Sequence, residues 1–185
     1  MSKTQENLLK AFAGESMARN KYSFYAAQAR EEGFEWVARI FEETAENEKA
    51  HAERLYHFIN DKVEMTNTYN INALRKTEEN LTHAAQGEKY EWGEMYPEFE
   101  KQARTENETE IADMFKEIAE VEEKHEERYL KLVEMLKENK MFESDKEIEW
   151  KCQNCGYIHE GKSAPIICPA CGKPHNWYMQ EGVLR

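Results

Sequence analysis

Two Glu-x-x-His motifs are the residues in this chain best suited to do chemistry: Glu48-Lys49-Ala50-His51 and Glu122-Glu123-Lys124-His125. Each lies in an apolar stripe of helical spacing, where a charged side chain is costly unless it is paired or bound to a metal. Because residues three apart share a helix face, each Glu and His can bind one cation together. Two such helices, with a glutamate from each of two others, form the ligand pattern of a carboxylate-bridged diiron site in a four-helix bundle.

Further glutamates on two other predicted helices complete that pattern. Glu15 lies on a stripe with Leu8 and Tyr22, and a weaker stripe between Leu81 and Phe99 carries two more carboxylates. The predicted ligands are Glu15, Glu48, His51, Glu91, Glu94, Glu122 and His125. Any one glutamate can face inward by chance, because glutamate is abundant here. Five together repel one another unless at least two divalent cations lie among them, so the whole set favours a dinuclear site.

The helical region repeats itself with an offset of 74 residues. The segment Gln28-Ala29-Arg30 recurs as Gln102-Ala103-Arg104, and the two Glu-x-x-His motifs superpose. We therefore expect two helical hairpins related by an approximate twofold axis. The match slips for Glu15 and Glu91, which are 76 residues apart. Nearby Gly93 and Pro97 predict a kink or one-turn bulge that helps to bring Glu91 and Glu94 inward.

Capping signals and polar segments set the expected boundaries. Ser2 with Gln5 resembles a capping box at the start of the first helix, which Gly33 ends. Asn72 is the expected N-cap of the third helix, and Thr105 with Glu108 resembles the capping box of the fourth. The four predicted helices run to about residue 32, then over 34–60, 72–104 and 105–139, with a long crossover over 61–71. We divide the chain into a bundle (1–140), a charged linker (141–149) and a small second domain (150–185).

All four cysteines lie in this second domain, as Cys152-Gln153-Asn154-Cys155 and Cys168-Pro169-Ala170-Cys171. Two Cys-x-x-Cys pairs at this separation are typical of a tetrahedral thiolate metal site. Disulfides are the alternative. Both zinc and iron suit four sulfurs; Gly156 and Gly172, which allow tight turns with backbone N–H groups directed at the sulfurs, favour iron over a zinc ribbon. The iron would be a one-electron centre beside the diiron site. Trp150, Tyr157 and Trp177 are expected to surround it.

Composition excludes several other classes of protein. The formal net charge is −12 and no basic patch stands out, which argues against nucleic-acid binding. The first residues lack the apolar core of a signal peptide, and no stretch has the length of a membrane span. We therefore expect a cytoplasmic protein with no membrane partner.

Several motifs together resemble those of the rubrerythrin family. They are Ala13-Gly14-Glu15-Ser16 with Ala18-Arg19-Asn20, the segment Glu94-Met95-Tyr96-Pro97, both Glu-x-x-His motifs, and the tail Cys152-Gln153-Asn154-Cys155-Gly156-Tyr157 with Cys168-Pro169-Ala170-Cys171-Gly172. The likeness extends over essentially the whole chain. It implies a mainly α fold, a ferritin-like four-helix bundle with a long crossover, followed by a small rubredoxin-like metal-binding domain.

The resemblance also implies a function. Rubrerythrins are non-haem diiron peroxidases that reduce hydrogen peroxide to water in oxidative-stress defence. Their electrons come from NAD(P)H through a reductase, often by way of rubredoxin, and they form homodimers. In this chain the resemblance makes Glu15, Glu48, Glu91, Glu94, Glu122 and His125 the ligands of two iron ions. It makes His51 the ligand that replaces Glu94 on reduction, places Tyr22 near the iron pair, and assigns a rubredoxin-type iron to Cys152, Cys155, Cys168 and Cys171.

Two other functions fit parts of the sequence. A ferroxidase, an oxidase or an iron-storage protein of the ferritin type requires the bundle alone, but storage needs no dedicated electron donor such as the cysteine site. A non-enzymatic binding protein with a zinc ribbon is the third alternative. Peroxide reduction needs two electrons and two protons, and a pair of ferrous ions supplies both electrons without releasing a hydroxyl radical. The sequence therefore favours a peroxidase, in which His51, Glu94 and Tyr22 act at the iron pair.

Overall fold

Two long helices form the first hairpin of the bundle: α1 (Lys3–Glu31) and α2 (Glu35–Tyr56). The computed structural model describes residues 2–60, 66–69 and 71–182. Ser2 caps α1, and its side chain accepts a hydrogen bond from the Gln5 backbone N–H, as expected. Gly33 adopts φ +83°, a left-handed conformation that glycine accepts without strain, and so reverses the chain between the two helices.

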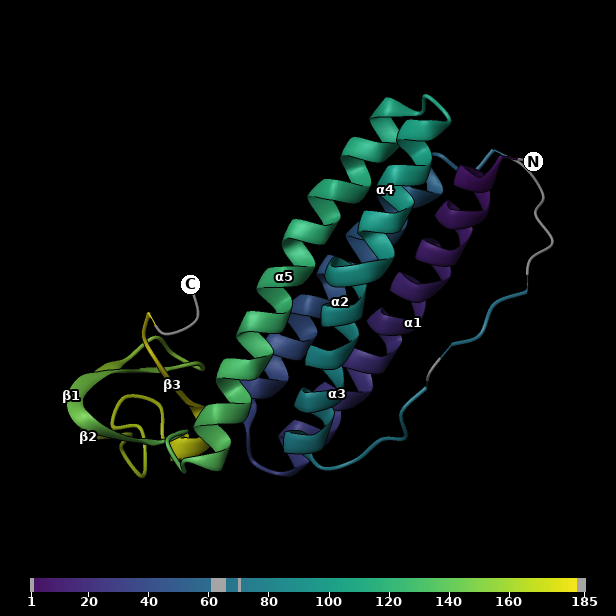
Figure 1. Cartoon of the computed structure of the whole chain (residues 1–185). Helices are drawn as coiled ribbons and strands as arrows, with labels where there is room; N and C mark the ends of the chain where they lie inside the picture. Colours follow the sequence, from purple (N-terminus) through teal and green to yellow (C-terminus); the bar gives the residue numbers. More distant parts are fainter. Residues whose placement is uncertain (1, 61–65, 70, 183–185) are drawn as a thin grey trace.

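The second hairpin consists of one interrupted rod and one continuous helix. The rod comprises α3 (Thr77–Tyr90), a π-helical turn η1 (Glu91–Met95) and α4 (Tyr96–Thr105), and α5 (Thr109–Lys137) runs back beside it (Figure 1). In the π turn the Tyr96 N–H donates to the Glu91 carbonyl five residues earlier. This turn is the one-turn bulge expected from Gly93 and Pro97.

Each hairpin helps to cap the other. The Glu106 carboxylate accepts hydrogen bonds from the backbone N–H groups of Lys3 and Thr4 at the start of α1. In the equivalent position, Glu32 accepts from the Thr77 N–H at the start of α3. These contacts between segments far apart in the chain correct two expectations. Asn72 is not the N-cap of α3, which begins five residues later, and the segment from Thr105 to Glu108 ends α4 and precedes α5 without a side-chain cap.

The core of the bundle divides into two apolar clusters. One cluster, nearer the C-terminal domain, includes Tyr22, Phe41 and Tyr129, and the other includes Tyr96 and Phe115. Buried glutamates and histidines lie between them along the helices. A mainly helical four-helix bundle with a long crossover between α2 and α3 is therefore confirmed (Figure 1). Its polar layer lies between the two hydrophobic clusters.

A small antiparallel sheet forms the C-terminal domain. Its strands are β1 (Glu143–Cys152), β2 (Ile158–Ser163) and β3 (Tyr178–Gln180), in the order β2-β1-β3, with a short 3-10 turn η2 (His175–Trp177) before β3. The segment 141–149, expected to be a charged linker, is mostly part of β1. Its charged side chains alternate along a strand that is held by backbone pairing to β2 and β3.

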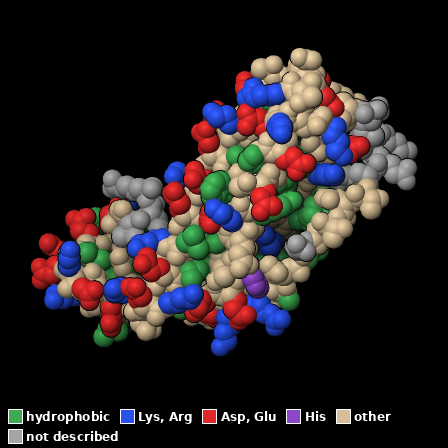
Figure 2. Space-filling view, viewed as in Figure 1, with side chains coloured by type: hydrophobic (Ala, Val, Ile, Leu, Met, Phe, Trp, Pro, Cys, Tyr) green, Lys and Arg blue, Asp and Glu red, His purple; other side chains and the backbone are tan. Residues whose placement is uncertain are grey.

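Aromatic contacts join this domain to the near end of the bundle. Phe34, just before α2, stacks on Phe142 with 6.4 Å between ring centroids, and Phe142 packs against His175 at 4.8 Å. The Arg39 guanidinium lies 5.6 Å from the centroid of the Trp177 ring. Figure 2 shows acidic and basic side chains interspersed over both parts of the molecule on the visible face. Among the described helices, none is both long enough and apolar enough to cross a membrane.

Candidate metal centres

The structure brings the two Glu-x-x-His motifs together inside the bundle. His51 Nδ1 lies 3.1 Å from Glu48 Oε2 and 2.8 Å from Glu122 Oε1. His125 Nδ1 lies 2.6 Å from Glu122 Oε2 and 3.3 Å from Glu48 Oε1. Each histidine therefore contacts the glutamates of both motifs, so the two glutamates sit between the histidines as bridging ligands of a dinuclear site would.

Two groups of potential ligands share these bridging glutamates. One group is Glu15, Glu48, His51 and Glu122, and the other is Glu48, Glu88, Glu122 and His125. Within each group the donor atoms all lie within 4.8 Å of one another. Four carboxylates and two histidines thus surround two adjacent positions, each suited to one cation.

Several of these donor atoms are buried without a hydrogen-bond partner. They are Glu15 Oε2, Glu48 Oε1, Glu88 Oε2, both carboxylate oxygens of Glu122, and His125 Nδ1. A buried polar atom that makes no hydrogen bond is costly. Two cations at these positions would satisfy all of them, and carboxylate oxygen and imidazole nitrogen are donors that iron accepts. The residues therefore fit a diiron centre.

Two predicted ligands, Glu91 and Glu94, lie outside both groups, and one carboxylate within them was missed. Glu94 is exposed and belongs to neither group of ligands, whereas Glu88, absent from the prediction, is fully buried and belongs to the second. The π turn explains the error, because it inserts one residue into the helical repeat and carries Glu94 to the outside. The buried face resumes at Tyr96, five residues after Glu91.

A signal for Glu88 is present in the sequence. Before the π turn the two halves match best with an offset of 73 residues, which pairs Gly14 with Gly87 and Glu15 with Glu88. After the π turn the offset is 74, as for Tyr22 and Tyr96. The slip is therefore one residue, not two, and it is located at the turn.

Glu91 lies beside the two groups without joining either. Burial raises the pKa of Glu91 well above its ordinary value, and the nearby charges of Glu15, Glu122 and Glu48 raise it further. Its side chain approaches α1 at Gly14, where an added Cβ would lie 4.0 Å from Glu91 Oε1. Glu91 is thus an additional carboxylate within reach of the candidate centre.

Crowded carboxylates shift the protonation of the whole layer. Burial raises the pKa of Glu15 to about 7, and burial followed by the charges of Glu48 and Glu122 raises that of Glu88 well above its ordinary value. Burial acts to lower the pKa of His125, but its close contacts with the Glu122 and Glu48 carboxylates outweigh it and raise the pKa to about 9. Without metal, these groups therefore hold protons that cations would displace.

Two tyrosines bind the outer edges of the carboxylate layer. The Tyr22 hydroxyl donates to Glu88 Oε1 over 2.5 Å, and the Tyr96 hydroxyl donates to Glu15. Both rings are buried. The contact of Tyr22 is thus with the glutamate that the sequence prediction omitted.

The four cysteines form the second centre. Cys152 Sγ lies 3.7 Å from Cys171 Sγ, and Cys155 Sγ lies 3.7 Å from Cys168 Sγ. These separations exclude disulfides, whose sulfurs are about 2.05 Å apart. A tetrahedral site with metal–sulfur bonds of about 2.3 Å has edges of about 3.8 Å. The four sulfurs are thus already spaced for one metal ion.

The surroundings of the sulfurs follow the expected pattern. Gly156 and Gly172 adopt φ +78° and +73°, and their N–H groups donate to the carbonyls of Cys152 and Cys168. Trp150, Tyr157, Trp177 and Tyr178 pack around the cysteines. Burial acts to raise the pKa of Cys168, but the Tyr178 hydroxyl and the backbone N–H groups of Ala170 and Cys171 outweigh it and lower the pKa to about 6. This environment stabilises a thiolate, the form that binds metal.

Known proteins share both centres in the same order. Residues 6–133 match the family model described as Rubrerythrin, and residues 150–178 match the model described as Rubrerythrin, rubredoxin-like domain. The chain is 47% identical to Rubrerythrin-1 of Clostridium acetobutylicum, over 96% of this chain and 93% of that protein. It is 46% identical to Rubrerythrin of Porphyromonas gingivalis, over 96% and 89% respectively.

Solved structures agree with the sequence comparison. Nigerythrin in its fully reduced, all-ferrous state superposes with a TM-score of 0.67 at 32% identity, covering 97% of this chain and 87% of that one. The resemblance seen in the sequence is therefore confirmed, as are a diiron carboxylate site and a four-cysteine rubredoxin-like site. The chain belongs to the rubrerythrin family of diiron oxidative-stress proteins.

Proposed function

We propose that this protein is a peroxidase that reduces hydrogen peroxide to water at the iron pair, with electrons supplied through the four-cysteine iron. The observation that carries the proposal is the presence in one chain of both donor sets: the unpaired carboxylate and imidazole atoms between α1, α2, α3 and α5, and the sulfur tetrahedron of the tail. When bound by these residues, the iron pair would supply two-electron redox chemistry and the cysteine iron would supply single electrons.

The residues that hold the iron pair follow from the two groups of ligands. We assign Glu48 and Glu122 as the bridging carboxylates, Glu15 and His51 to one ion, and Glu88 and His125 to the other. The hydroxyls of Tyr22 and Tyr96 then orient the outer carboxylates. This assignment replaces Glu94 by Glu88.

Glu91, not Glu94, would be the carboxylate that holds iron in exchange with His51 when the oxidation state changes. Its position supports this role, because Glu91 lies near Glu15 and Glu122 but outside both ligand groups. An anionic carboxylate stabilises ferric iron better than neutral imidazole does, so oxidation favours Glu91 and reduction favours His51. In the reduced Glu91→Gln variant, the iron should lie next to His51. A crystal structure of that variant with the iron still beside residue 91 would contradict the exchange.

Electron delivery is expected to involve other protein molecules. A rubredoxin or an NAD(P)H-dependent reductase would reduce the cysteine iron. The protein would act as a homodimer or a higher homo-oligomer. Analytical ultracentrifugation and a reconstituted NAD(P)H assay with purified rubredoxin test these two points independently.

A stopped-flow experiment tests the reaction itself. The iron-loaded protein is reduced without oxygen and mixed with one equivalent of hydrogen peroxide, and the ferric–thiolate absorption of the cysteine iron is followed. We expect this colour to return much faster with peroxide than with dissolved oxygen. A faster return with oxygen would favour an oxidase or ferroxidase of the ferritin type instead.

A further inference from the structure

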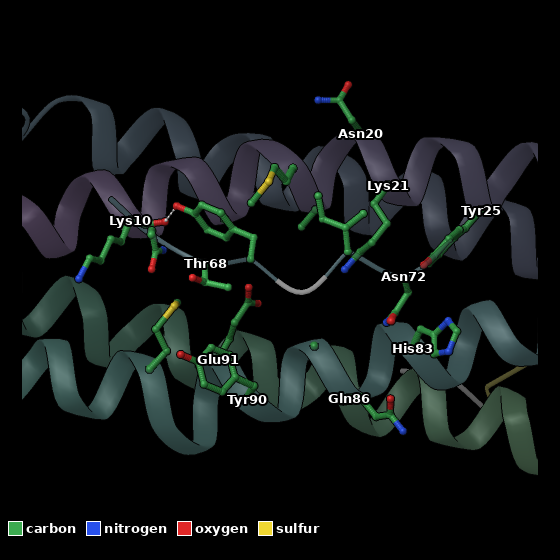
Figure 3. Close-up of a pocket in the computed structure, with 18 of the residues that line it drawn as sticks. Lys10, Asn20, Lys21, Tyr25, Thr68, Asn72, His83, Gln86, Tyr90 and Glu91 are labelled. Atoms are coloured by element: carbon green, nitrogen blue, oxygen red, sulfur yellow. Dashed lines mark hydrogen bonds between the residues drawn. The ribbon is translucent and has the colours of Figure 1, made fainter. Parts of the chain in front are cut away.

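An open groove beside the candidate diiron site is much larger than hydrogen peroxide requires. It lies between α1 and the α3–η1 rod, next to the described crossover residues 67–69, 71, 72 and 74, and has a volume of about 900 Å³. Figure 3 shows Glu91 entering this space from one wall and Lys21 from the other. Glu91 lies close to Glu15 and Glu122 on its other side, so the groove leads directly to the candidate centre.

Large apolar side chains are exposed along the groove. Four large side chains are substantially exposed around it: Phe24 (61%), Ile71 (80%), Leu74 (52%) and Tyr90 (54%). Isolated exposed apolar residues are common on proteins, but a contiguous group around a concavity marks a binding surface.

Polar groups converge at the inner end of the groove. Glu91 approaches Gly14 on α1, and Lys21 approaches Gly87 on α3, where an added Cβ would lie 3.6 Å from Lys21 Nζ. Each side chain thus crosses the groove to the opposite wall. A cationic donor and a carboxylate therefore enter the groove from opposite walls, and amide and hydroxyl side chains line it as well (Figure 3).

We propose that this groove binds alkyl hydroperoxides, so that the protein reduces these compounds as well as hydrogen peroxide; the inference rests on the peroxidase function proposed above. The alkyl tail lies along Phe24, Ile71 and Leu74, and the hydroperoxide group lies between Lys21 and Glu91. Small-molecule sites are typically concavities of about 300–1,000 Å³ with apolar walls and a few convergent polar groups. A water-sized molecule occupies only about 30 Å³, so a channel for hydrogen peroxide alone needs none of this apolar surface.

The reaction at this site is balanced by the reductant of the proposed function. The O–O bond of the hydroperoxide breaks and takes up two electrons and two protons, giving one alcohol and one water. The electrons come from a reduced rubredoxin-type donor through the protein's iron sites, and the protons come from solvent. Lys21 donates a hydrogen bond to the hydroperoxide, and the apolar groove retains the tail.

A second copy of the chain is the competing occupant of this surface. The convergence of Lys21 and Glu91 at the inner end favours a small molecule, because a protein surface covering Phe24 and Leu74 would leave those two groups without a partner. Sedimentation of the wild type and of Phe24→Asp decides between the two occupants.

Substrates of different tail length test the proposal. The reduced, iron-loaded protein is mixed with hydrogen peroxide, tert-butyl hydroperoxide or linoleate hydroperoxide, and kcat/KM is measured for each. We expect linoleate hydroperoxide to match or exceed hydrogen peroxide. Phe24→Asp should lower kcat/KM for linoleate hydroperoxide at least tenfold and change that for hydrogen peroxide less than twofold. Leu130→Asp, at an exposed leucine on α5 outside the groove, is the matched control and should change neither.

A binding measurement provides a readout other than turnover. The alcohol formed from linoleate hydroperoxide is titrated by calorimetry into the oxidised, iron-loaded protein. It should bind to the wild type and to Leu130→Asp, and at least tenfold more weakly to Phe24→Asp.

Three results would overturn the proposal. Normal reduction of hydrogen peroxide without reduction of linoleate hydroperoxide, or without binding of its alcohol, rejects the groove as a substrate site while the peroxidase function stands. Loss of an oligomer in Phe24→Asp assigns the groove to a second copy. Failure to reduce any peroxide rejects both the peroxidase function and this extension of it.

Discussion

The Tyr22 hydroxyl on α1 donates to the buried Glu88 carboxylate on α3, and the reverse contact also exists: Tyr96 on α4 donates to Glu15 on α1. The two tyrosines are repeat counterparts, as are the two glutamates. Each hairpin therefore holds a carboxylate of the other in place. The approximate twofold relation seen in the sequence thus also relates these two individual hydrogen bonds.

Removal of either tyrosine hydroxyl should destabilise the metal-free bundle. Tyr22→Phe and Tyr96→Phe should each lower the free energy of unfolding by about 1–2 kcal/mol, because each leaves a buried carboxyl group with one donor fewer. Urea denaturation in the presence of a chelator measures the change. Tyr25→Phe is the matched control, since its buried hydroxyl makes no hydrogen bond. Equal losses in all three variants would show that the packing of the buried hydroxyl, not its hydrogen bond, is responsible.

Substitution of Glu88 and of Glu94 should affect iron binding differently. Glu88→Gln should reduce the iron content of the bundle by about one ion per chain, because Glu88 is buried within one ligand group. Glu94→Gln should retain the wild-type content, since Glu94 is exposed. Elemental analysis measures total iron, and visible absorption measures the cysteine-bound fraction. Iron loss confined to Glu94→Gln would restore the ligand set first expected from the sequence.

Metal-free protein should lose stability as the pH rises. The pKa of Glu15 is raised from 4.5 to about 7, so its contribution is complete below pH 4.5 and is lost as the pH passes through 7. The pKa of His125 is raised from 6.5 to about 9, so its contribution is complete below pH 6.5 and is lost as the pH passes through 9. Both act in the same direction between pH 5 and 9.

Thermal unfolding at three pH values tests this dependence. With chelator present, Tm should fall from pH 5 to 7 and again from pH 7 to 9. With iron bound, the stabilisation relative to the metal-free protein should grow over the same range, because protons compete with the metal for the same atoms. A metal-free Tm that rises with pH would contradict the assignment of protons to this layer.

Loss of the cysteine site should affect the tail alone. Cys155→Ser should abolish the ferric–thiolate absorption and unfold the small domain, which is too small to fold well without its metal. The bundle should retain its helical circular dichroism and a single turnover with peroxide, but steady cycling should cease. Cooperative loss of helix in the same variant would show that the two domains fold as one unit.

Local patterns in the sequence predicted most of the helices and both metal-binding clusters. The apolar stripes around Glu48 and Glu122 repeat every three or four residues, so the inward direction of these side chains depends only on helix geometry. The cysteine pairs are equally local. The N-cap of α1, in which the Ser2 side chain accepts from the Gln5 backbone N–H, was likewise predicted from adjacent residues.

The failures arise where distant residues decide the structure. Helix α3 begins at Thr77 because Glu32 at the end of α1 accepts its N–H and because the Asn80 side chain pairs with the Arg75 backbone. The start of β1 depends on pairing with β2, twenty residues away in the case of Glu143 and Ser163. Glu94 was misplaced because a regular helical period was assumed across the π turn.

The carboxylate of Glu91, at the start of the π turn, makes the two metal positions unequal. Under the 73-residue offset Glu91 corresponds to Ala18, a buried apolar residue, so the extra carboxylate has no counterpart on α1. Two ions bound here would therefore experience different negative fields, although the surrounding helices repeat. We expect them to be acquired and reduced one after the other, with a distinct half-reduced form between the end states.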